Sequence, residues 1–201
     1  LALKDTGWDK FQVISAVLCF LFAFLMQIDS NLINDYFDFV HGNDDPGSRL
    51  GPKRACAEGW ITTKAMLIGI VVVSTIACLF GLPLIYYGGW EMVIVGAVCV
   101  LFAFLYTTFF SYKGLGDILV LVFFGLVPVM FTYYVIMPAS MQQFTGVTIA
   151  CGLGCGMVID TLLRINNFRD RHNDARDGKR TLIVRLGENR GAQLYNIIGL
   201  V

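Results

Sequence analysis

Two short clusters of Asp and Asn residues, each at the polar end of a long apolar stretch, are the side chains in this sequence best suited to chemistry. The first cluster is Asn31, Asn34, Asp35, Asp38 and Asp44, and the second is Asn166, Asn167, Asp170 and Asp174. Like-charged carboxylates one helical turn apart repel each other, and a bound cation removes that cost. Hard oxygen ligands suit Mg²⁺, which bridges one or two carboxylates to the phosphates of a substrate. The two clusters therefore predict a magnesium site for a diphosphate.

The spacing within each cluster supports a common helical face. If the apolar stretches continue as helices, Asn31, Asp35 and Asp38 stand at i, i+4 and i+7, and Asn166, Asp170 and Asp174 at i, i+4 and i+8. Either cluster alone could be a solvated helix end or a turn. Two clusters with the same spacing favour one shared site.

The elements that must position these clusters are transmembrane helices. Hydrophobic residues make up 56% of the 201 residues and charged residues 15%, and the mean hydropathy is +0.67, which excludes an ordinary soluble domain. Crossing a bilayer takes about 20 apolar residues. We predict an all-α, polytopic transmembrane bundle that forms one domain over 1–201, with complete spans at 11–33, 65–87, 91–112, 116–137 and 144–165 and a sixth beginning near Leu194. No Met opens the chain and it stops within an apolar run, so we expect both ends to be truncated.

The positive charges are concentrated beside the acidic clusters. Thirteen of the fifteen Lys and Arg residues fall at the same set of span ends, whereas the opposite connections at 86–91 and 137–143 hold none. By the positive-inside rule, both clusters face the cytoplasm. The partners that we expect are a lipid bilayer and the ligand of the acidic site, with no nucleic acid, and the sequence indicates no oligomeric state.

Several basic and buried polar residues extend the candidate site. Cations that could contact a diphosphate flank the clusters: Arg49, Lys53, Arg54, Arg169, Lys179 and Arg180. Their alternative role is to anchor the chain at the membrane surface. Asp29 and Asp160 lie about one turn deeper, where ionisable residues are costly, and we expect them to line a polar cavity. Tyr106 is either a substrate contact or, as we favour, an interfacial residue.

The motifs around both clusters resemble those of a known family. The segments Asn34–Phe39 with Gly42 and Asp44, Arg49–Arg54, Tyr112–Asp117, Asn166–Asp174 and Gly178–Leu182 are similar to the Asp-rich motifs of the UbiA superfamily of intramembrane prenyltransferases. Within that superfamily, they resemble the branch that acts on 1,4-dihydroxy-2-naphthoate in menaquinone synthesis. Two positions depart from the general pattern: Gly42 stands where a third acid is usual, and Phe110 stands where a Lys follows Tyr106 by four residues.

The resemblance implies a fold and a reaction. Members have nine transmembrane helices, so this chain would hold the second to the sixth and the start of the seventh. Two Mg²⁺ ions would bind the diphosphate of a polyprenyl donor, and an aromatic acceptor would attack the allylic carbon. The implied metal ligands are Asp35, Asp38, Asp44, Asp170 and Asp174, of which Asp35, Asp38, Asp170 and Asp174 are the candidate catalytic residues. Asn31, Asn34, Asn167 and Tyr106 would join the six cations in binding substrate.

Two alternatives remain open from the sequence. The acceptor could be 4-hydroxybenzoate, homogentisate or a tetrapyrrole, which would leave the mechanism unchanged. A secondary transporter could also hold acids within the membrane, but transporter sites usually lie near the bilayer midplane. In this chain the acids lie at the rim of the spans, which favours the enzyme. We expect an integral protein of a bacterial inner membrane.

Overall fold

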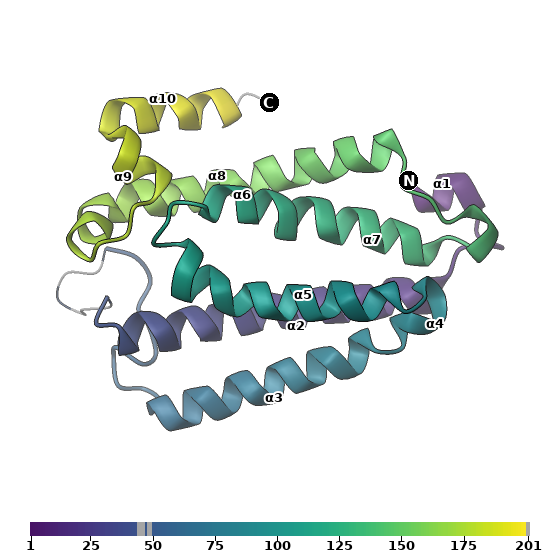
Figure 1. The fold of residues 1–201 in the computed structure, drawn as a ribbon, viewed down its shortest axis with the longest axis horizontal. Helices are drawn as coiled ribbons and strands as arrows, with labels where there is room; N and C mark the ends of the chain where they lie inside the picture. Colours follow the sequence, from purple (N-terminus) through teal and green to yellow (C-terminus); the bar gives the residue numbers. More distant parts are fainter. Residues whose placement is uncertain (44–46, 48–49, 200–201) are drawn as a thin grey trace.

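The chain folds into a bundle of long helices that lie side by side, as the computed structural model shows (Figure 1). The structure describes residues 1–43, 47 and 50–199, without the side chains of 195 and 197–199. In this part of the chain there is no strand, and five helices are long and apolar enough to cross a membrane: Val13–Val40, Thr63–Gly81, Glu91–Phe110, Gly116–Ile136 and Gly146–Arg176. The predicted all-α fold with five spans is confirmed.

Some of these spans consist of more than one element. In chain order the elements are α1 (Ala2–Thr6), α2 (Val13–Val40), α3 (Thr63–Gly81), α4 (Leu84–Gly88), α5 (Glu91–Leu105), η1 (Tyr106–Phe110), α6 (Gly116–Val120), η2 (Leu121–Leu126), α7 (Val127–Ile136), η3 (Ala139–Met141), α8 (Gly146–Arg176), α9 (Leu182–Leu186) and α10 (Glu188–Gly199). The segments η1 and η2 are π-helical. Such widened turns are frequent at functional sites, and η1 carries Tyr106.

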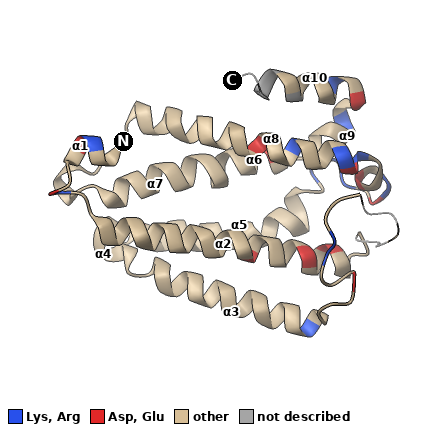
Figure 2. Cartoon of the chain, turned by 180° about the vertical axis from the view of Figure 1, so that it is seen from behind, with Lys and Arg blue, Asp and Glu red and all other residues tan. Residues whose placement is uncertain are grey.

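The two acidic clusters lie on helices that are longer than a membrane requires. The helix α2 has 28 residues and α8 has 31, against about 20 for a span. Their last turns carry the clusters, and these turns lie at the same end of the bundle (Figure 2). Both helices therefore extend beyond the apolar stretches, as the spacing argument requires.

The predicted second span, 65–87, is wrong from position 82 onward. The helix α3 ends at Gly81, and Pro83 starts the separate short helix α4. Proline has no N–H to donate to the preceding turn, so the ladder of backbone hydrogen bonds is interrupted at Pro83. The proline therefore ends the helix instead of bending it. The sixth predicted span corresponds to α10, which begins at Glu188.

Glycines bring η2 and α8 into backbone contact. A Cβ atom on Gly125 would lie 2.5 Å from the Gly152 carbonyl oxygen and 2.6 Å from the Gly156 Cα. Small residues of this kind let transmembrane helices approach closely. This contact holds the span that contains α6 against α8.

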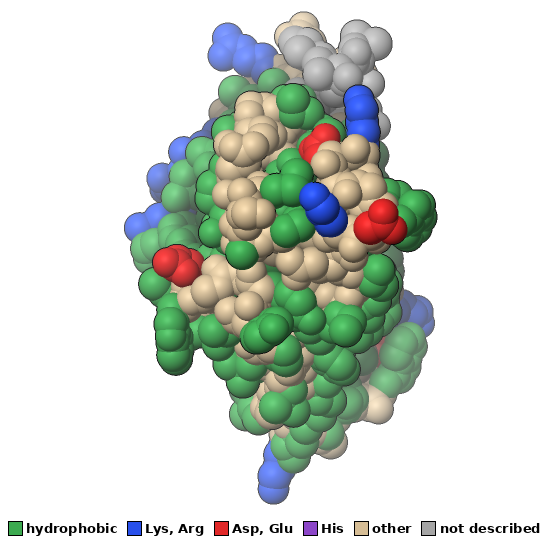
Figure 3. Space-filling view, turned by 90° about the vertical axis from the view of Figure 1, so that its right-hand side faces the viewer, with side chains coloured by type: hydrophobic (Ala, Val, Ile, Leu, Met, Phe, Trp, Pro, Cys, Tyr) green, Lys and Arg blue, Asp and Glu red, His purple; other side chains and the backbone are tan. Residues whose placement is uncertain are grey.

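The outer surface of the bundle is apolar along its length. Large hydrophobic side chains such as Phe20, Val71, Ile94 and Val158 are exposed on different helices, and Figure 3 shows hydrophobic side chains over much of one face. A soluble protein rarely exposes so much apolar surface. The surface suits contact with lipid.

Candidate active site

Asp35 of the first cluster is held by the loop that follows α2. Its side chain is buried, and its two carboxylate oxygens accept hydrogen bonds from the backbone N–H groups of Ala55 at 2.8 Å and Cys56 at 3.0 Å. Cys56 also packs with Ile33 of α2 and with Ile70 of α3. Asp35 therefore fixes the loop over the end of α2. Each carboxylate oxygen keeps a second lone pair, so this arrangement leaves room for a metal ligand role.

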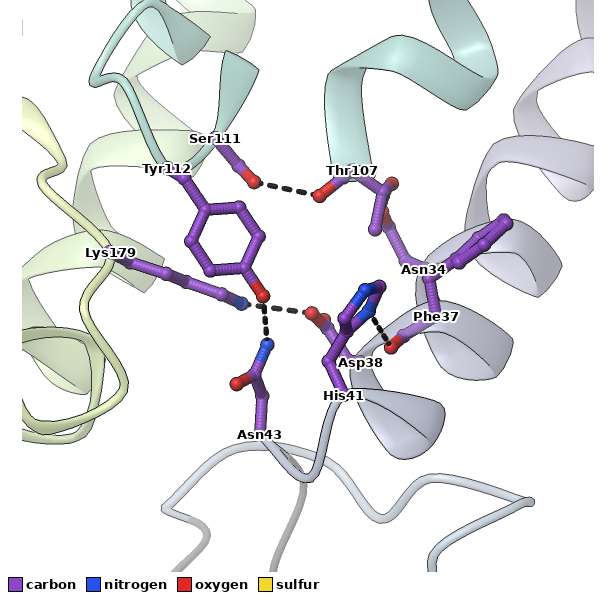
Figure 4. A network of polar contacts seen from close by, with 9 residues as sticks. All are labelled: Asn34, Phe37, Asp38, His41, Asn43, Thr107, Ser111, Tyr112 and Lys179. Atoms are coloured by element: carbon purple, nitrogen blue, oxygen red, sulfur yellow. Dashed lines mark hydrogen bonds and ion pairs between the residues drawn. The ribbon is translucent and has the colours of Figure 1, made fainter. Parts of the chain in front are cut away.

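The two Asn residues of the first cluster point in different directions. Asn34 accepts a hydrogen bond from the Thr107 hydroxyl of η1 and so ties α2 to that segment (Figure 4). Asn31 is exposed, and its amide donates to the Gln27 carbonyl of its own helix at 2.8 Å. In the structure, Asn34 therefore links helices, whereas this hydrogen bond of Asn31 stays within α2.

Asp38 joins the first cluster to the loop that follows the second. Its Oδ1 lies 2.9 Å from the Nζ of Lys179, and both side chains are largely buried (Figure 4). The backbone N–H of Lys179 donates to the Asp174 carbonyl at 2.8 Å. Burial lowers the pKa of Lys179, but the charges of Asp38 and Asp174 outweigh it and leave that pKa above its ordinary value. Lys179 is therefore a cation placed between the two clusters.

Tyr112 completes the network around Lys179. Its hydroxyl accepts a hydrogen bond from the Asn43 amide, and its ring centroid is 5.8 Å from the Lys179 ammonium (Figure 4). The Tyr112 carbonyl also accepts from the backbone N–H of Arg180 at 3.2 Å. The short turn between η1 and α6 thus contacts the loops after both acidic clusters.

The second cluster approaches the first loop through Arg169. The Arg169 guanidinium makes two bonds to the adjacent Asp170, from Nε at 2.8 Å and from Nη2 at 2.6 Å. A Cβ atom on Gly51 would lie 2.7 Å from the same Nη2, so the loop passes directly over this guanidinium. Asp174 lies within electrostatic reach of Asp38, Asp170 and Lys179. The structure brings Asp38, Asp170, Asp174, Arg169 and Lys179 to one place.

The other predicted site residues are more scattered. Lys53 is exposed and pairs with Glu58 at 3.1 Å, Arg54 is half-buried in the same loop, and the Arg180 side chain is exposed. Asn167 and Tyr106 line a small cavity beside α6. Asp44 and Arg49 lie outside the residues that the structure describes.

A buried ion cluster beneath this region was missed by the sequence reasoning. Arg164 of α8 lies between Asp160 of α8, at 2.6 Å, and Asp117 of α6, at 3.2 Å, and both contacts are made by its Nε. The sequence predicts Asp160 as a deep acid, whereas Arg164 counts there only as one of the thirteen Lys and Arg residues at the same set of span ends. The i, i+4 spacing of Asp160 and Arg164 was the available signal. The pairing with Asp117 depends on how α6 packs against α8.

Asp29 lies on the face of α2 that packs against α3. It is completely buried, and one of its carboxylate oxygens accepts a hydrogen bond from the Ser74 hydroxyl of α3. Its other oxygen, Oδ1, has no hydrogen-bond partner among the described residues. The cavity expected beside Asp29 stays a prediction.

The donor set at the junction of the clusters suits a hard divalent cation. Among the described residues, no three Asp, Glu, His or Cys side chains are grouped as a complete metal cage. Mg²⁺ does not need one, because it usually takes one or two carboxylates and fills its other positions with water and substrate phosphate. The carboxylates of Asp38 and Asp174, close enough to influence each other, fit that pattern.

Comparison with known proteins identifies the family. The family model described as the UbiA prenyltransferase family matches residues 1–201. Proteins named 1,4-dihydroxy-2-naphthoate octaprenyltransferase are 38% identical in Escherichia coli (89% of this chain, 59% of the relative), 36% in Mycobacterium leprae (98% and 64%) and 37% in Haemophilus influenzae (90% and 60%). The chain thus spans about three-fifths of the length of these relatives, and no solved structure matches it. With a match over its whole length, the chain belongs to the UbiA prenyltransferase family.

Proposed function

We propose that this chain forms the diphosphate-binding part of an enzyme that transfers a polyprenyl group from a polyprenyl diphosphate to an aromatic acceptor. The observation that carries the proposal is the contact between Lys179 and Asp38, which joins the two acidic clusters at one end of an apolar bundle. A diphosphate headgroup needs cations and metal-binding acids at the membrane surface. Its isoprenoid tail needs the apolar surroundings below.

In this proposal the side chains at the junction have different roles in binding the metal and the diphosphate. Asp38 and Asp174, with Asp170 and Asp35, would hold Mg²⁺, and Asn34 and Asn167 would supply neutral oxygens. Bound Mg²⁺ supplies positive charge that stabilises the departing diphosphate. Lys179 and Arg169 are already at the junction and would add hydrogen bonds to the same oxygens. The apolar spans would keep water from the allylic carbon.

The acceptor that we propose is 1,4-dihydroxy-2-naphthoate, in menaquinone biosynthesis. The support is the naming of the bacterial relatives, whose identity to this chain is 36–38% over most of its length. Residues of the longer protein would complete the acceptor site.

We further propose that the acidic end of the bundle faces the cytoplasm of a bacterial inner membrane. Thirteen of fifteen Lys and Arg residues belong to the connections at this end, and the positive-inside rule then gives the orientation. The other two, Lys4 and Lys10, lie in and after α1, which Figure 2 shows at the opposite end.

The test is Mg²⁺-dependent turnover by the purified full-length protein in lipid nanodiscs. With octaprenyl diphosphate and 1,4-dihydroxy-2-naphthoate, we expect release of inorganic diphosphate together with a decarboxylated, prenylated naphthol, and loss of both on chelation of the metal. Asp170→Asn should abolish both products. Asp9→Asn, an exposed acid before α2, is the matched control and should behave as the wild type. Substrate flux across vesicles without diphosphate release would overturn the proposal in favour of a transporter.

A further inference from the structure

The buried ion cluster of Asp117, Asp160 and Arg164 has one more acid than base. Only about 5–6% of Asp160 and Arg164 is exposed, so both lie in surroundings where an uncompensated charge is costly. The Nε of Arg164 carries a single hydrogen, and that hydrogen is donated to Asp160 at 2.6 Å. Asp117, at 3.2 Å from the same nitrogen, receives charge compensation but no hydrogen bond from it. The second carboxylate is therefore only partly satisfied.

Three polar atoms of this cluster lack a hydrogen-bond partner among the described residues. They are Oδ1 of Asp117, Oδ1 of Asp160 and Nη1 of Arg164, and all three are buried. Buried polar atoms in native proteins normally have partners, so unpartnered ones call for a ligand or water. Two are acceptors and one is a donor, so they could bind a group that both donates and accepts hydrogen bonds, such as a hydroxyl or a water.

The wall of a small cavity includes Asp117. The cavity has a volume of about 20 Å³, room for one water, and its polar lining is Tyr106, Ser111, Asp117, Asn167 and Thr181. Asn167 belongs to the second acidic motif. The groups that face Asp117 from the neighbouring elements are Tyr106 of η1, which contacts Gly116, and Asp160 and Arg164 of α8. The cavity thus lies between the buried acid Asp117 and one residue of the second acidic motif, Asn167.

The electrostatics of Tyr106 show how near the two sites are. The charges of Asp117 and Asp160 act on its hydroxyl, and so do those of Asp38 and Asp174 from the acidic clusters. The Tyr106 hydroxyl is therefore within electrostatic reach of both groups of acids.

We propose that Asp117 is the base that accepts the proton of the acceptor's ring hydroxyl, held in place by Arg164. This inference rests on the proposed prenyl transfer and adds its missing proton acceptor. The O–H bond breaks and its proton goes to a carboxylate oxygen of Asp117, directly or through one water in the cavity. The electron pair left on oxygen moves into the ring, and the adjacent, carboxylate-bearing carbon bonds to the allylic carbon.

The step balances without any further reagent. The allylic C–O bond breaks and its electron pair leaves with the diphosphate. The ring is then a ketone with a carboxylate on the neighbouring carbon, an arrangement that loses CO2 readily. The electron pair released by CO2 restores the aromatic ring, and Asp117 returns its proton to the ring oxygen. Asp117 ends the cycle ionised, as it began.

Asp117→Asn in the full-length enzyme tests this inference, because it keeps the shape of the side chain and removes the base. With octaprenyl diphosphate, 1,4-dihydroxy-2-naphthoate and Mg²⁺ under anaerobic conditions, we expect kcat at pH 7 to fall by about 10²–10⁴-fold. The deficit should shrink as the pH rises and the acceptor hydroxyl ionises in solution, and Mg²⁺-dependent binding of the prenyl diphosphate should not change. Asp29→Asn is the matched control. Asp29 is a buried acid that faces Ser74 instead, and the variant should follow the wild type at every pH.

The outcomes separate the inference from the proposed function. If the wild type releases no diphosphate, the proposed function is wrong, and the assignment of Asp117 as the base is wrong with it. If the wild type turns over while Asp117→Asn keeps its rate, or loses rate with an unchanged pH profile, Asp117 is not the base. If Asp117→Asn does not fold, the inference is tested on the wild-type enzyme instead, with two methyl ethers of the acceptor as substrates. The 1-methoxy ether should react far more slowly than the 4-methoxy ether, and equal rates would overturn the inference.

Discussion

The two acidic clusters share a spacing but not an environment. Both oxygens of Asp35 in the first cluster are bound by backbone N–H groups of the following loop. In the second cluster, Asp170 is paired with its neighbour Arg169, and Asp174 lies close to the like charges of Asp38 and Asp170. Asp35 therefore stabilises the fold in the absence of ligand, whereas Asp174 lies among like charges that a bound cation would relieve. Two clusters with similar motifs can thus differ in role, one mainly structural and the other mainly ligand-binding.

Replacing Asp174 should give the largest loss of activity with no loss of stability. We expect Asp174→Asn to lower kcat by about 10²–10³-fold, the usual cost of removing one stabilising group from a transition state. The thermal midpoint should stay the same or rise. The substitution removes the cost of burying the charge and the repulsion with Asp38, Asp170 and Asp177, which together outweigh the lost attraction to Lys179. Turnover against Mg²⁺ concentration and thermal unfolding in detergent measure the two effects. A lowered midpoint would show that Asp174 is a structural acid.

Asp35→Asn should lower both activity and stability. An Asn amide brings a donor to a position where two backbone N–H groups already donate, so at least one hydrogen bond to a charged acceptor is lost. Such bonds contribute about 1.5–3 kcal/mol each. We expect a lower thermal midpoint and faster proteolysis of the 50–62 loop, alongside reduced turnover. A variant with wild-type stability would remove the contrast between the clusters.

Lys179→Gln should weaken substrate binding more than Lys53→Gln. Lys179 is buried at the junction, whereas the Lys53 side chain is 67% exposed and pairs only at the surface with Glu58. Interactions of about 1.5–3 kcal/mol with a charged partner correspond to roughly 10–100-fold in KM for the prenyl diphosphate. For Lys53 we expect little change, since exposed pairs contribute little. Steady-state kinetics measure KM for the prenyl diphosphate in both variants. Equal increases in KM would show that the ion pair with Asp38 does not matter for binding.

The sequence predicted the elements better than the contacts between them. Apolar length was sufficient for all five spans, and only Pro83 ended one of them early. Helical spacing placed Asp38 and Asp174 correctly at the ends of long helices. It could not show that Asp35 turns toward Ala55 and Cys56, or that Asp29 faces α3, because both depend on the packing of distant segments. Arg164 was missed for the same reason: its partner Asp117 lies 47 positions away in the sequence, and the two meet because α6 packs against α8.

Gly51→Ala should give the smallest effect and report on the contact between the two loops. The new methyl group would start 2.7 Å from Nη2 of Arg169, so this flexible guanidinium must move and its pair with Asp170 must loosen. Because the obstacle is the end of a long side chain, we expect a few-fold loss of turnover and less than about 1 kcal/mol of stability. Gly69→Ala in α3 is the matched control. Its Cβ meets open space, and Ala favours the helix, so stability should rise slightly at unchanged activity. If Gly51→Ala behaves like this control, Arg169 does not depend on the first loop for its position, and the two clusters meet only through Lys179.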